Sequence, residues 1–148
     1  MPGVEVTKVL KEKTEDLHRA VSKLTLLPAQ DALTLLRFSL SIPKLMYTLR
    51  TSNCESNPAV EEFDNELRTG LSGILNVDLS GDQWHQASLP VRDGGLGIRS
   101  AVILAPSAFL ASAAGTTELQ ARILPPPISI VPDDSVISAL QGWSARSQ

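Results

Sequence analysis

The stretch Leu89-Pro-Val-Arg-Asp-Gly-Gly-Leu-Gly-Ile-Arg-Ser-Ala101 places three glycines between two short apolar segments. Glycine is needed where the backbone takes a positive φ or turns tightly. The stretch therefore predicts a small β-hairpin or turn near residues 89–98. The chain after Ser100, a typical helix-capping residue, is apolar as far as Ala114, which predicts a helix that is buried centrally or faces a partner. A capping-box pattern then predicts a second, short helix over residues 117–124.

Apolar residues upstream of this stretch recur at three- and four-residue steps, which is the period of an amphipathic helix. The pattern predicts helices over residues 6–24, 29–50 and 58–74. Pro43 should kink or divide the second of them, because proline removes a backbone donor. Asn57 and Pro58 are typical of a helix start, and a short turn that holds Trp84 is expected before the glycines.

Three prolines mark the clearest boundary in the sequence. Pro125-Pro126-Pro127 cannot continue a helix and favours an extended connector. The chain is therefore expected to consist of a helical domain at residues 1–124, a proline-rich linker at residues 125–132 and a truncated C-terminal helix at residues 133–148.

The composition is typical of a helical globular protein. The 148 residues are 43% hydrophobic but only 4% aromatic. This composition excludes a disordered chain and favours packed helices, so we predict an all-α fold of five or six helices. The net charge of −3 argues against strong autonomous binding to nucleic acid, which usually goes with a basic balance.

Three segments of the chain carry motifs in a fixed order. Asp31–Thr51 has the form D-A-L-x-L-L-R-x-S-x-x-x-P-K-x-x-Y-x-L-R-T, and Phe63–Arg68 has the form F-D-x-x-L-R. Trp84–Ala114 has the form W-x-Q-A-x-L-P-x-x-x-G-G-L-G-I-R followed by A-P-S-A-F-L-A-S-A-A. Together they resemble the region downstream of the polymerase core in reverse transcriptases of non-LTR retrotransposons. The resemblance covers roughly residues 15–125.

The resemblance implies a fragment of an RNA-directed DNA polymerase. That family synthesises DNA with two divalent metal ions held by aspartates of a palm domain, and its Tyr/Phe-x-Asp-Asp strand is absent from this sequence. We therefore expect no autonomous catalysis, no catalytic or metal-binding residues and no cofactor. A structural role is expected for the motif residues Trp84, Leu89, Pro90, Gly94, Gly95 and Gly97.

In this family, helices after the palm form a thumb that grips the template–product duplex, which implies that basic residues position phosphates without reading bases. Residues 1–57 contain eight lysines and arginines and six acidic residues, whereas residues 58–120 contain three and eight. The candidate phosphate contacts are Lys8, Lys11, Arg19, Lys23, Lys44 and Arg50. No aromatic residues are expected to interleave with them as in a single-strand stacking platform. Because a thumb borrows most of its grip from the palm and fingers, we predict weak contact with a duplex.

Other residues of catalytic type have structural explanations. Asp133-Asp134 precedes a helical pattern and fits a helix cap rather than a metal-binding pair. His18 and His85 have no metal-ligand spacing, and Gly95-Leu-Gly97 lacks the rest of a phosphate-binding loop. Cys54 is alone, so it forms no internal disulfide.

No basic segment followed by an apolar one opens the chain, so a signal peptide is not expected. The apolar stretch Ala101–Ala114 is shorter than the roughly 20 residues that a membrane span needs. These features predict a soluble protein of the cytoplasm or the nucleus. Two other classes stay open: a helical protein-interaction module, whose apolar face binds the palm domain or another protein, and an independent enzyme with a site that the sequence does not reveal.

Overall fold

Leucines spaced seven residues apart set the packing of the first helix. In the computed structural model, which describes residues 2–124 and 132–146, Leu10, Leu17 and Leu24 are almost fully buried on one side of α1 (Pro2–Leu24). That side packs along α4 (Pro58–Leu75). The two helices run parallel, as the hydrogen bond from Asn57 before α4 to Thr7 near the start of α1 shows.

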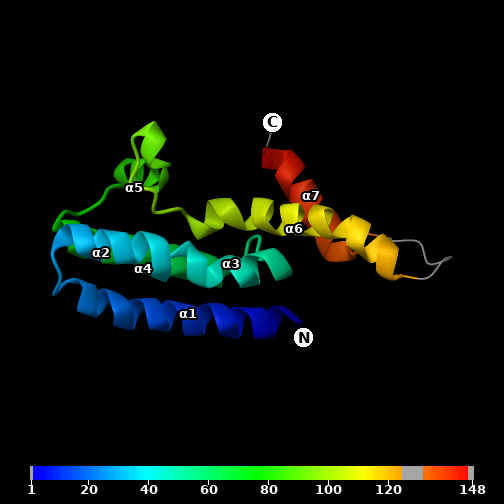
Figure 1. The fold of residues 1–148 in the computed structure, drawn as a ribbon, viewed down its shortest axis with the longest axis horizontal. Helices are drawn as coiled ribbons and strands as arrows, with labels where there is room; N and C mark the ends of the chain where they lie inside the picture. The colour runs from blue at the N-terminus through cyan, green and yellow to red at the C-terminus, as the bar shows by residue number, and fades with distance from the viewer. Residues whose placement is uncertain (1, 125–131, 147–148) are drawn as a thin grey trace.

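The described residues form helices and turns and no strand, so the all-α prediction is confirmed (Figure 1). The remaining elements are α2 (Ala29–Leu35), η1 (Leu36–Leu40), α3 (Ile42–Thr51), α5 (Gly81–Ser88), η2 (Val91–Asp93), α6 (Ala101–Ile123) and α7 (Asp134–Arg146). In Figure 1 the α2–α3 segment runs between α1 on one side and α6 on the other, and α3 packs against both.

The helix expected over residues 29–50 is divided, as the proline predicted. Pro43 stands in the first turn of α3, where its missing N–H leaves no intrahelical bond unmade. Between α2 and α3 lies the π-helical turn η1, in which the N–H of Ser41 donates to the carbonyl of Leu36 at 3.0 Å. The sequence did not predict this turn, which belongs to a rare class that is frequent at functional sites.

α4 begins where the sequence predicted. The side chain of Asn57 accepts a hydrogen bond from the N–H of Ala59 at 3.0 Å, and Pro58 occupies the first turn. The large apolar residues on one face of the helix are buried in the centre of the core, namely Val60, Phe63, Leu67 and Leu71.

The residues around Trp84 form the helix α5 and not the expected turn. Ser80 accepts a hydrogen bond from the N–H of Gln83, and the Gln83 side chain accepts one from the N–H of Ser80 at 2.9 Å. This capping box satisfies two backbone donors at once, and its stabilisation of the helix outweighs the low helix propensity of Gly81 at the first helical position. The Ser-x-x-Gln pattern is the sequence feature that distinguishes a helix start from a turn here.

The glycine-rich segment takes the form of a turn rather than of paired strands. The N–H of Gly95 donates to the carbonyl of Pro90 at 3.1 Å, and the N–H of Gly97 donates to the carbonyl of Leu89 at 2.9 Å. The single turn of 3₁₀-helix η2 lies between these contacts. The short apolar segments on either side therefore approach each other without forming a ladder.

The helix that begins at Ala101 runs unbroken to Ile123, so the prediction of a separate helix over residues 117–124 is wrong. The hydroxyls of Thr116 and Thr117 donate to the carbonyl of Ala113 at 3.1 and 3.2 Å. They are therefore satisfied inside a continuous helix and do not cap a new one.

The unbroken length of α6 also bears on whether this helix could span a membrane. With 23 residues, α6 is long and apolar enough to cross a bilayer by length and composition alone, so length does not by itself exclude a membrane span. In the structure the first half of α6 packs against α3 and α4 through residues such as Ala101, Ala105 and Phe109. The second half carries the exposed charges of Glu118 and Arg122.

The C-terminal helix α7 is capped by Asp133, whose carboxylate accepts a hydrogen bond from the N–H of Ser135 at 2.6 Å, as the cap interpretation predicted. The helix packs on α6 and is tied to the loop after α3. There Asn53 donates to the carbonyl of Ser135 at 3.1 Å, and Arg146 pairs with Glu55 at 3.2 Å. α7 thus packs against the helices that precede it. Pro125-Pro126-Pro127 and almost all of the predicted linker lie outside the described residues.

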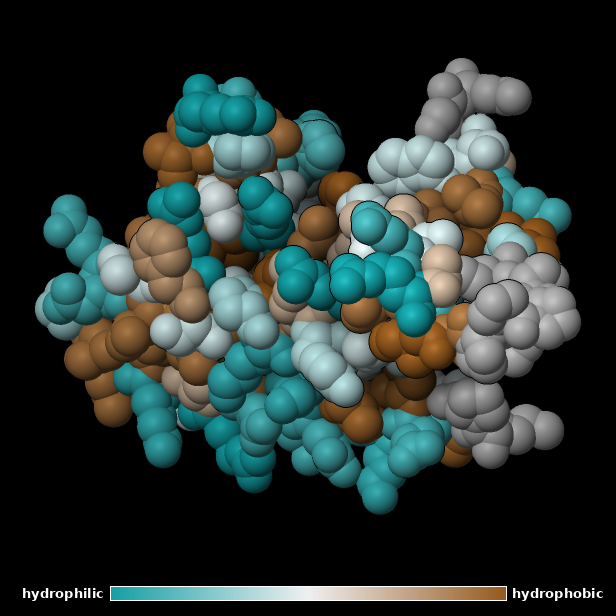
Figure 2. All heavy atoms as spheres, turned by 45° about the vertical axis from the view of Figure 1, so that its right-hand side comes forward, coloured by the Kyte–Doolittle hydropathy of each residue, from teal (hydrophilic) through white to brown (hydrophobic). Residues whose placement is uncertain are grey.

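Apolar side chains gather on the surface near the end of α6 and on α7. Figure 2 turns this end of the molecule toward the viewer and shows brown patches there. The exposed apolar residues of the two helices in this region are Leu119, Ile123, Ile137, Leu140 and Trp143. A cavity of about 820 Å³ lies between α6, α7 and the end of α3, with Leu110, Val136 and Leu140 in its wall.

Candidate nucleic-acid interface

The six basic residues that the sequence selected lie on more than one surface. Lys11 and Arg19 line a groove of about 530 Å³ between α1 and α4. Three carboxylates, Glu15, Glu62 and Glu66, line the same groove. Because acidic residues stand beside the basic ones, this groove has no excess of positive charge to offer a phosphate.

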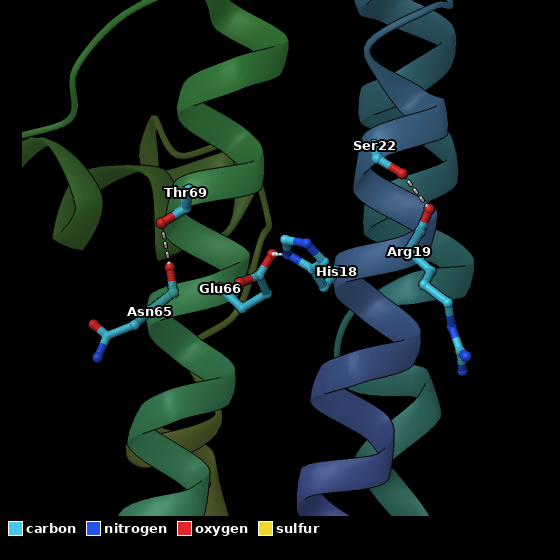
Figure 3. A network of polar contacts seen from close by, with 6 residues as sticks. All are labelled: His18, Arg19, Ser22, Asn65, Glu66 and Thr69. Carbon is cyan, nitrogen blue, oxygen red and sulfur yellow. Dashed lines mark hydrogen bonds and ion pairs between the residues drawn. The ribbon is translucent and has the colours of Figure 1, made fainter.

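Ion pairs use part of the remaining charge on α1. The Arg19 guanidinium bonds the carboxylate of Asp16 and, with help from the charges of Lys44 and Lys13, holds the pKa of that carboxyl below its ordinary value. Figure 3 shows the other pair of this region, in which Nδ1 of His18 lies 2.8 Å from Oε1 of Glu66. His18 therefore connects α1 to α4, which agrees with its structural interpretation. The other two selected residues of α1, Lys8 and Lys23, are exposed.

Lys44 lies on a second surface, between α1 and α3. A cavity of about 550 Å³ there is lined by Lys44, Lys13 and Tyr47, together with the carboxylate-bearing Glu5. The Tyr47 side chain is 79% exposed. One side of α3 thus presents Lys44 and Tyr47 together, so a single aromatic residue accompanies one of the selected basic residues.

Arg50 lies on a third surface, where it meets two arginines that the sequence did not select. Arg50 and Arg99 line a cavity of about 580 Å³ over α3 and α6. Arg99 and Arg37 line an adjoining cavity of about 540 Å³ beside η1 and the glycine turn. Met46 stands in the wall of both cavities. We call these two neighbouring cavities, which share Met46 and Arg99 and also contain Arg37 or Arg50, the arginine groove.

The arginine groove is positive because nothing in it compensates the arginines. None of the described residues that line its two cavities is acidic. Within the described part of the chain, the ion pairs formed by arginine involve Arg19, Arg92 and Arg146, and not the three arginines of the groove. Although the protein has a net charge of −3, this local surface therefore presents positive charges without nearby carboxylates that would repel a phosphate.

The side chain of Arg37 is held in place by its neighbours. Its guanidinium lies over the ring of Phe38, 4.8 Å from the ring centroid, in a cation–π contact. Arg37 also lies against Gly97 of the glycine turn, where an added Cβ would come within 2.8 Å of the Arg37 Nε. Gly97 has a φ of +72°, so it serves both the turn and the space that Arg37 needs.

The side chain of Arg99 is positioned by the residues on either side of it. Ile98 is buried in the core, and Ser100 caps α6 by accepting a hydrogen bond from the N–H of Ile103 at 3.3 Å. These two anchors fix the backbone at Arg99 while its side chain remains exposed. The glycine motif therefore has a definite structural consequence, which is to present an arginine at the start of α6.

Asp64 of α4, the aspartate of the F-D-x-x-L-R motif, holds the start of α6 in place, a role that the sequence analysis did not predict. Its side chain is only 7% exposed, and it accepts hydrogen bonds from the Ser100 hydroxyl, from the N–H of Ala101 at 2.7 Å and from the N–H of Val102 at 3.2 Å. Burial raises the pKa of the Asp64 carboxyl, and these hydrogen bonds oppose the shift. The second motif, F-D-x-x-L-R, thus stabilises the start of α6, which lies within the third motif segment.

The other motif residues lie close to this junction. Trp84 packs against the core, and Leu89 and Pro90 supply the carbonyls that close the glycine turn. Gly94 has a φ of +84°, and Gly95 passes the carbonyl of Leu89 so closely that a Cβ would lie 2.0 Å from its oxygen. These positions have a conformational role, as the sequence indicated.

The remaining residues of catalytic type are dispersed. In the part of the chain that the structure describes, no three histidine, cysteine, aspartate or glutamate side chains converge in a way that would hold a metal ion. His85 is exposed on α5. Cys54 is buried, which raises the pKa of its thiol to about 11 and keeps it neutral near neutral pH.

The fold and the site together define an all-helical protein with a basic surface groove that contains no acidic residue. No protein-family model, no curated protein and no solved structure matches the chain. The arginine groove is suited to bind anions along its length by charge–charge contacts and by hydrogen bonds from guanidinium groups, which favour phosphate.

Proposed function

We propose that this chain is a post-palm, thumb-like part of an RNA-directed DNA polymerase of the non-LTR retrotransposon kind. In this proposal the arginine groove contacts the phosphate backbone of nucleic acid weakly and without regard to sequence. The chain catalyses no reaction by itself, and the palm domain of such a polymerase is its natural protein partner. Its site of action is the cytoplasm or the nucleus, where nucleic-acid ligands occur.

One observation carries this proposal. The three arginines of the groove come from different parts of the motifs: Arg37 from L-L-R, Arg50 from L-R-T and Arg99 from G-I-R. These parts are separated by up to 62 positions in the chain, from Arg37 to Arg99, yet the three arginines line two neighbouring cavities that share Arg99. The motifs that carry the resemblance are therefore also the source of the positive groove.

The test compares two sets of substitutions by fluorescence anisotropy with a labelled duplex. The double variant R50Q/R99Q removes two cations from the groove, and the quadruple variant K8Q/K11Q/R19Q/K23Q removes four from α1. We expect wild type to bind at low salt with a Kd no tighter than about 10⁻⁶ M, as is typical of non-specific contact. The double variant should lose most of the binding, although it changes fewer charges.

Two results would contradict this assignment. A larger loss in the quadruple variant would place the contact on α1, which contains four of the six basic residues selected from the sequence. Salt-insensitive nanomolar binding would contradict a weak electrostatic contact altogether. A separate assay with primer–template, Mg²⁺ and dNTPs should give no primer extension above a heat-treated control, since the sequence has no Tyr/Phe-x-Asp-Asp strand.

A second candidate function is a helical protein-interaction module. It is favoured by the cavity of about 820 Å³ between α6 and α7 and by the exposed apolar residues near it, such as Leu140. Apolar surfaces of this kind often mark protein contacts. This function predicts no binding to nucleic acid even at low salt, and association with a purified palm domain that Ala114→Glu, in the wall of the cavity, abolishes.

A further inference from the structure

We propose that the arginine groove prefers single-stranded nucleic acid over duplex, with an unpaired base stacked on Phe38 and the neighbouring phosphates on the groove arginines. This inference rests on the proposed contact with nucleic acid and makes it specific: it names the strand state of the ligand and the residue that recognises it.

Phe38 is placed to receive a base. Its side chain is 63% exposed although it is fully apolar, and it lines the same cavity as Arg37 and Arg99. Arg37 covers part of the ring by its cation–π contact and leaves much of the remainder open to solvent. Aromatic rings beside cations are the elements from which single-strand platforms are built, because every base has a face that can stack.

A second apolar group stands in the same cavity. Val91 of η2 is 54% exposed and lines the cavity together with Phe38 and Pro90. A base that leaves a duplex exposes both of its faces to water, whereas bases inside a duplex are already stacked. Binding in an apolar cavity with an aromatic ring in its wall is therefore more favourable for an unpaired base than for the already stacked bases of a duplex.

The backbone under Phe38 is fixed before any ligand binds. The π-helical turn η1 contains Arg37 and Phe38 and is closed by the hydrogen bond from Ser41 to Leu36. Leu36 and Ser41, at its two ends, are both buried, and Gly97 limits the space of Arg37 from the opposite side. Pre-organisation of this kind reduces the entropy lost on binding.

The cavity contains few groups that could read a base edge. Apart from its two arginines, Ser41 is the described residue with a polar side chain among those that line it, and that residue is buried. No asparagine or glutamine, which pair with adenine, and no aspartate or glutamate, which pair with cytosine, lines this cavity. The preference should therefore be for unpaired strands in general, with little dependence on their sequence.

The test uses labelled oligonucleotides of about 12 nucleotides, a length within the range that such sites cover. Three probes are compared by anisotropy at low salt: a single strand, a duplex of the same sequence, and a single strand with abasic sites in its centre. Phe38→Leu keeps an apolar side chain but removes the ring. Tyr47→Leu is the matched control, because Tyr47 is also an exposed aromatic residue, at 79% against 63% for Phe38, yet it lines another cavity.

We expect wild type to bind the single strand several-fold more tightly than the duplex. Loss of one stacked base corresponds to about 1–3 kcal/mol, so Phe38→Leu should weaken single-strand binding at least about 5-fold and leave duplex binding unchanged. Abasic sites should weaken wild type to the same degree and have no further effect on Phe38→Leu. Tyr47→Leu should behave as wild type, and circular dichroism should confirm that both variants are folded.

The outcomes separate this inference from the proposed function. Equal binding of single strand and duplex, with both sensitive to R50Q/R99Q, would overturn the stacking inference and leave the phosphate contact in place. An equal loss in Phe38→Leu and Tyr47→Leu would overturn the role of Phe38. No binding of any probe at low salt would overturn both proposals.

Discussion

At the scale of single residues, Gly97 matters to both the glycine turn and the arginine groove, because each requires a residue without a Cβ at this position. Its φ of +72° is a conformation that costs other L-residues about 1–2 kcal/mol, and a Cβ would also displace the end of the Arg37 side chain. Gly97→Ala should therefore lower the free energy of unfolding by about 1–2 kcal/mol in a urea titration. Gly115→Ala is the control, since it lies in α6 with nothing within 4 Å and should raise stability by about 0.5–1 kcal/mol. A neutral Gly97→Ala would show that the turn does not require glycine there.

The raised pKa of Asp64 predicts how the stability of the protein depends on pH. Burial raises the pKa of the Asp64 carboxyl above the ordinary 3.8. At pH values between 3.8 and this raised pKa, the folded protein therefore binds more protons than the unfolded chain. The contribution of Asp64 to stability is thus fully present below pH 3.8 and is lost as pH rises through the raised pKa. The difference in unfolding free energy between wild type and Asp64→Asn should therefore fall as pH rises above 3.8.

Asp133 supplies a control of opposite sign for this experiment. Hydrogen bonds from the backbone and the hydroxyl of Ser135 lower the pKa of its carboxyl below 3.8, so its contribution is present above that pH and is lost as the pH falls. The difference between wild type and Asp133→Asn should rise with pH where that for Asp64→Asn falls. Parallel curves for the two variants would mean that burial does not govern the titration of Asp64.

At the scale of elements, the contact between α1 and α4 depends on one residue without a side chain. A Cβ at Gly70 would lie 2.6 Å from Cγ2 of Val21, whereas one at Gly73 would lie 3.7 Å from Thr25. Valine is stiff in a helix, so Gly70→Ala has to push the helices apart, which costs about 1–3 kcal/mol. Both variants gain helix propensity.

The comparison of these two variants isolates the packing effect. Gly73→Ala should be neutral or stabilising, and Gly70→Ala should be less stable than Gly73→Ala by about 1–3 kcal/mol in thermal or urea unfolding. Equal stabilities would indicate that α1 lies more loosely on α4 than the distances suggest.

The same elements show what the sequence was able to predict and why. α1 and α4 follow directly from their apolar period, and Asn57 and Asp133 were identifiable as caps because their bonding partners are two residues away. The continuity of α6 was not predictable from a capping pattern, because Thr117 can bond back to Ala113 as well as forward. The π-turn η1 was missed because it differs from an α-helix by one residue per turn, which leaves no trace in an apolar pattern.

The candidate site was harder to predict from the sequence, because it depends on contacts between residues that are far apart in the chain. Arg50 was selectable by charge alone, but Arg37 and Arg99 gain their significance only because η1 and the glycine turn bring them to one surface. Likewise, Asp64 and Ser100 are 36 positions apart, and nothing local to either residue indicates that they bond. The motifs mark the segments, whereas the arrangement of those segments depends on the fold.

At the scale of the whole molecule, charge is distributed so that a chain of net −3 keeps one cationic groove. Acidic residues are concentrated after residue 57, and Glu62 and Glu66 accompany the basic residues of α1 at the α1–α4 groove. The overall negative charge should repel polyanions at long range and slow their association, especially at low salt. Binding, where it occurs, should therefore depend on few contacts.

The number of contacts sets the salt dependence, which is the prediction for the whole molecule. Each phosphate neutralised contributes about −0.7 to the slope of log K against log salt on a single strand and about −0.9 on a duplex. With Arg37, Arg50 and Arg99 as the contacts, the slope should be about −2 on a single strand and no steeper than about −3 on a duplex. R50Q/R99Q should leave a single-strand slope of about −0.7, measured by titrations at several salt concentrations. A wild-type slope steeper than about −5 would require cations beyond the groove, and the lysines of α1 would then be the first to test, because they are the next largest group of exposed positive charges.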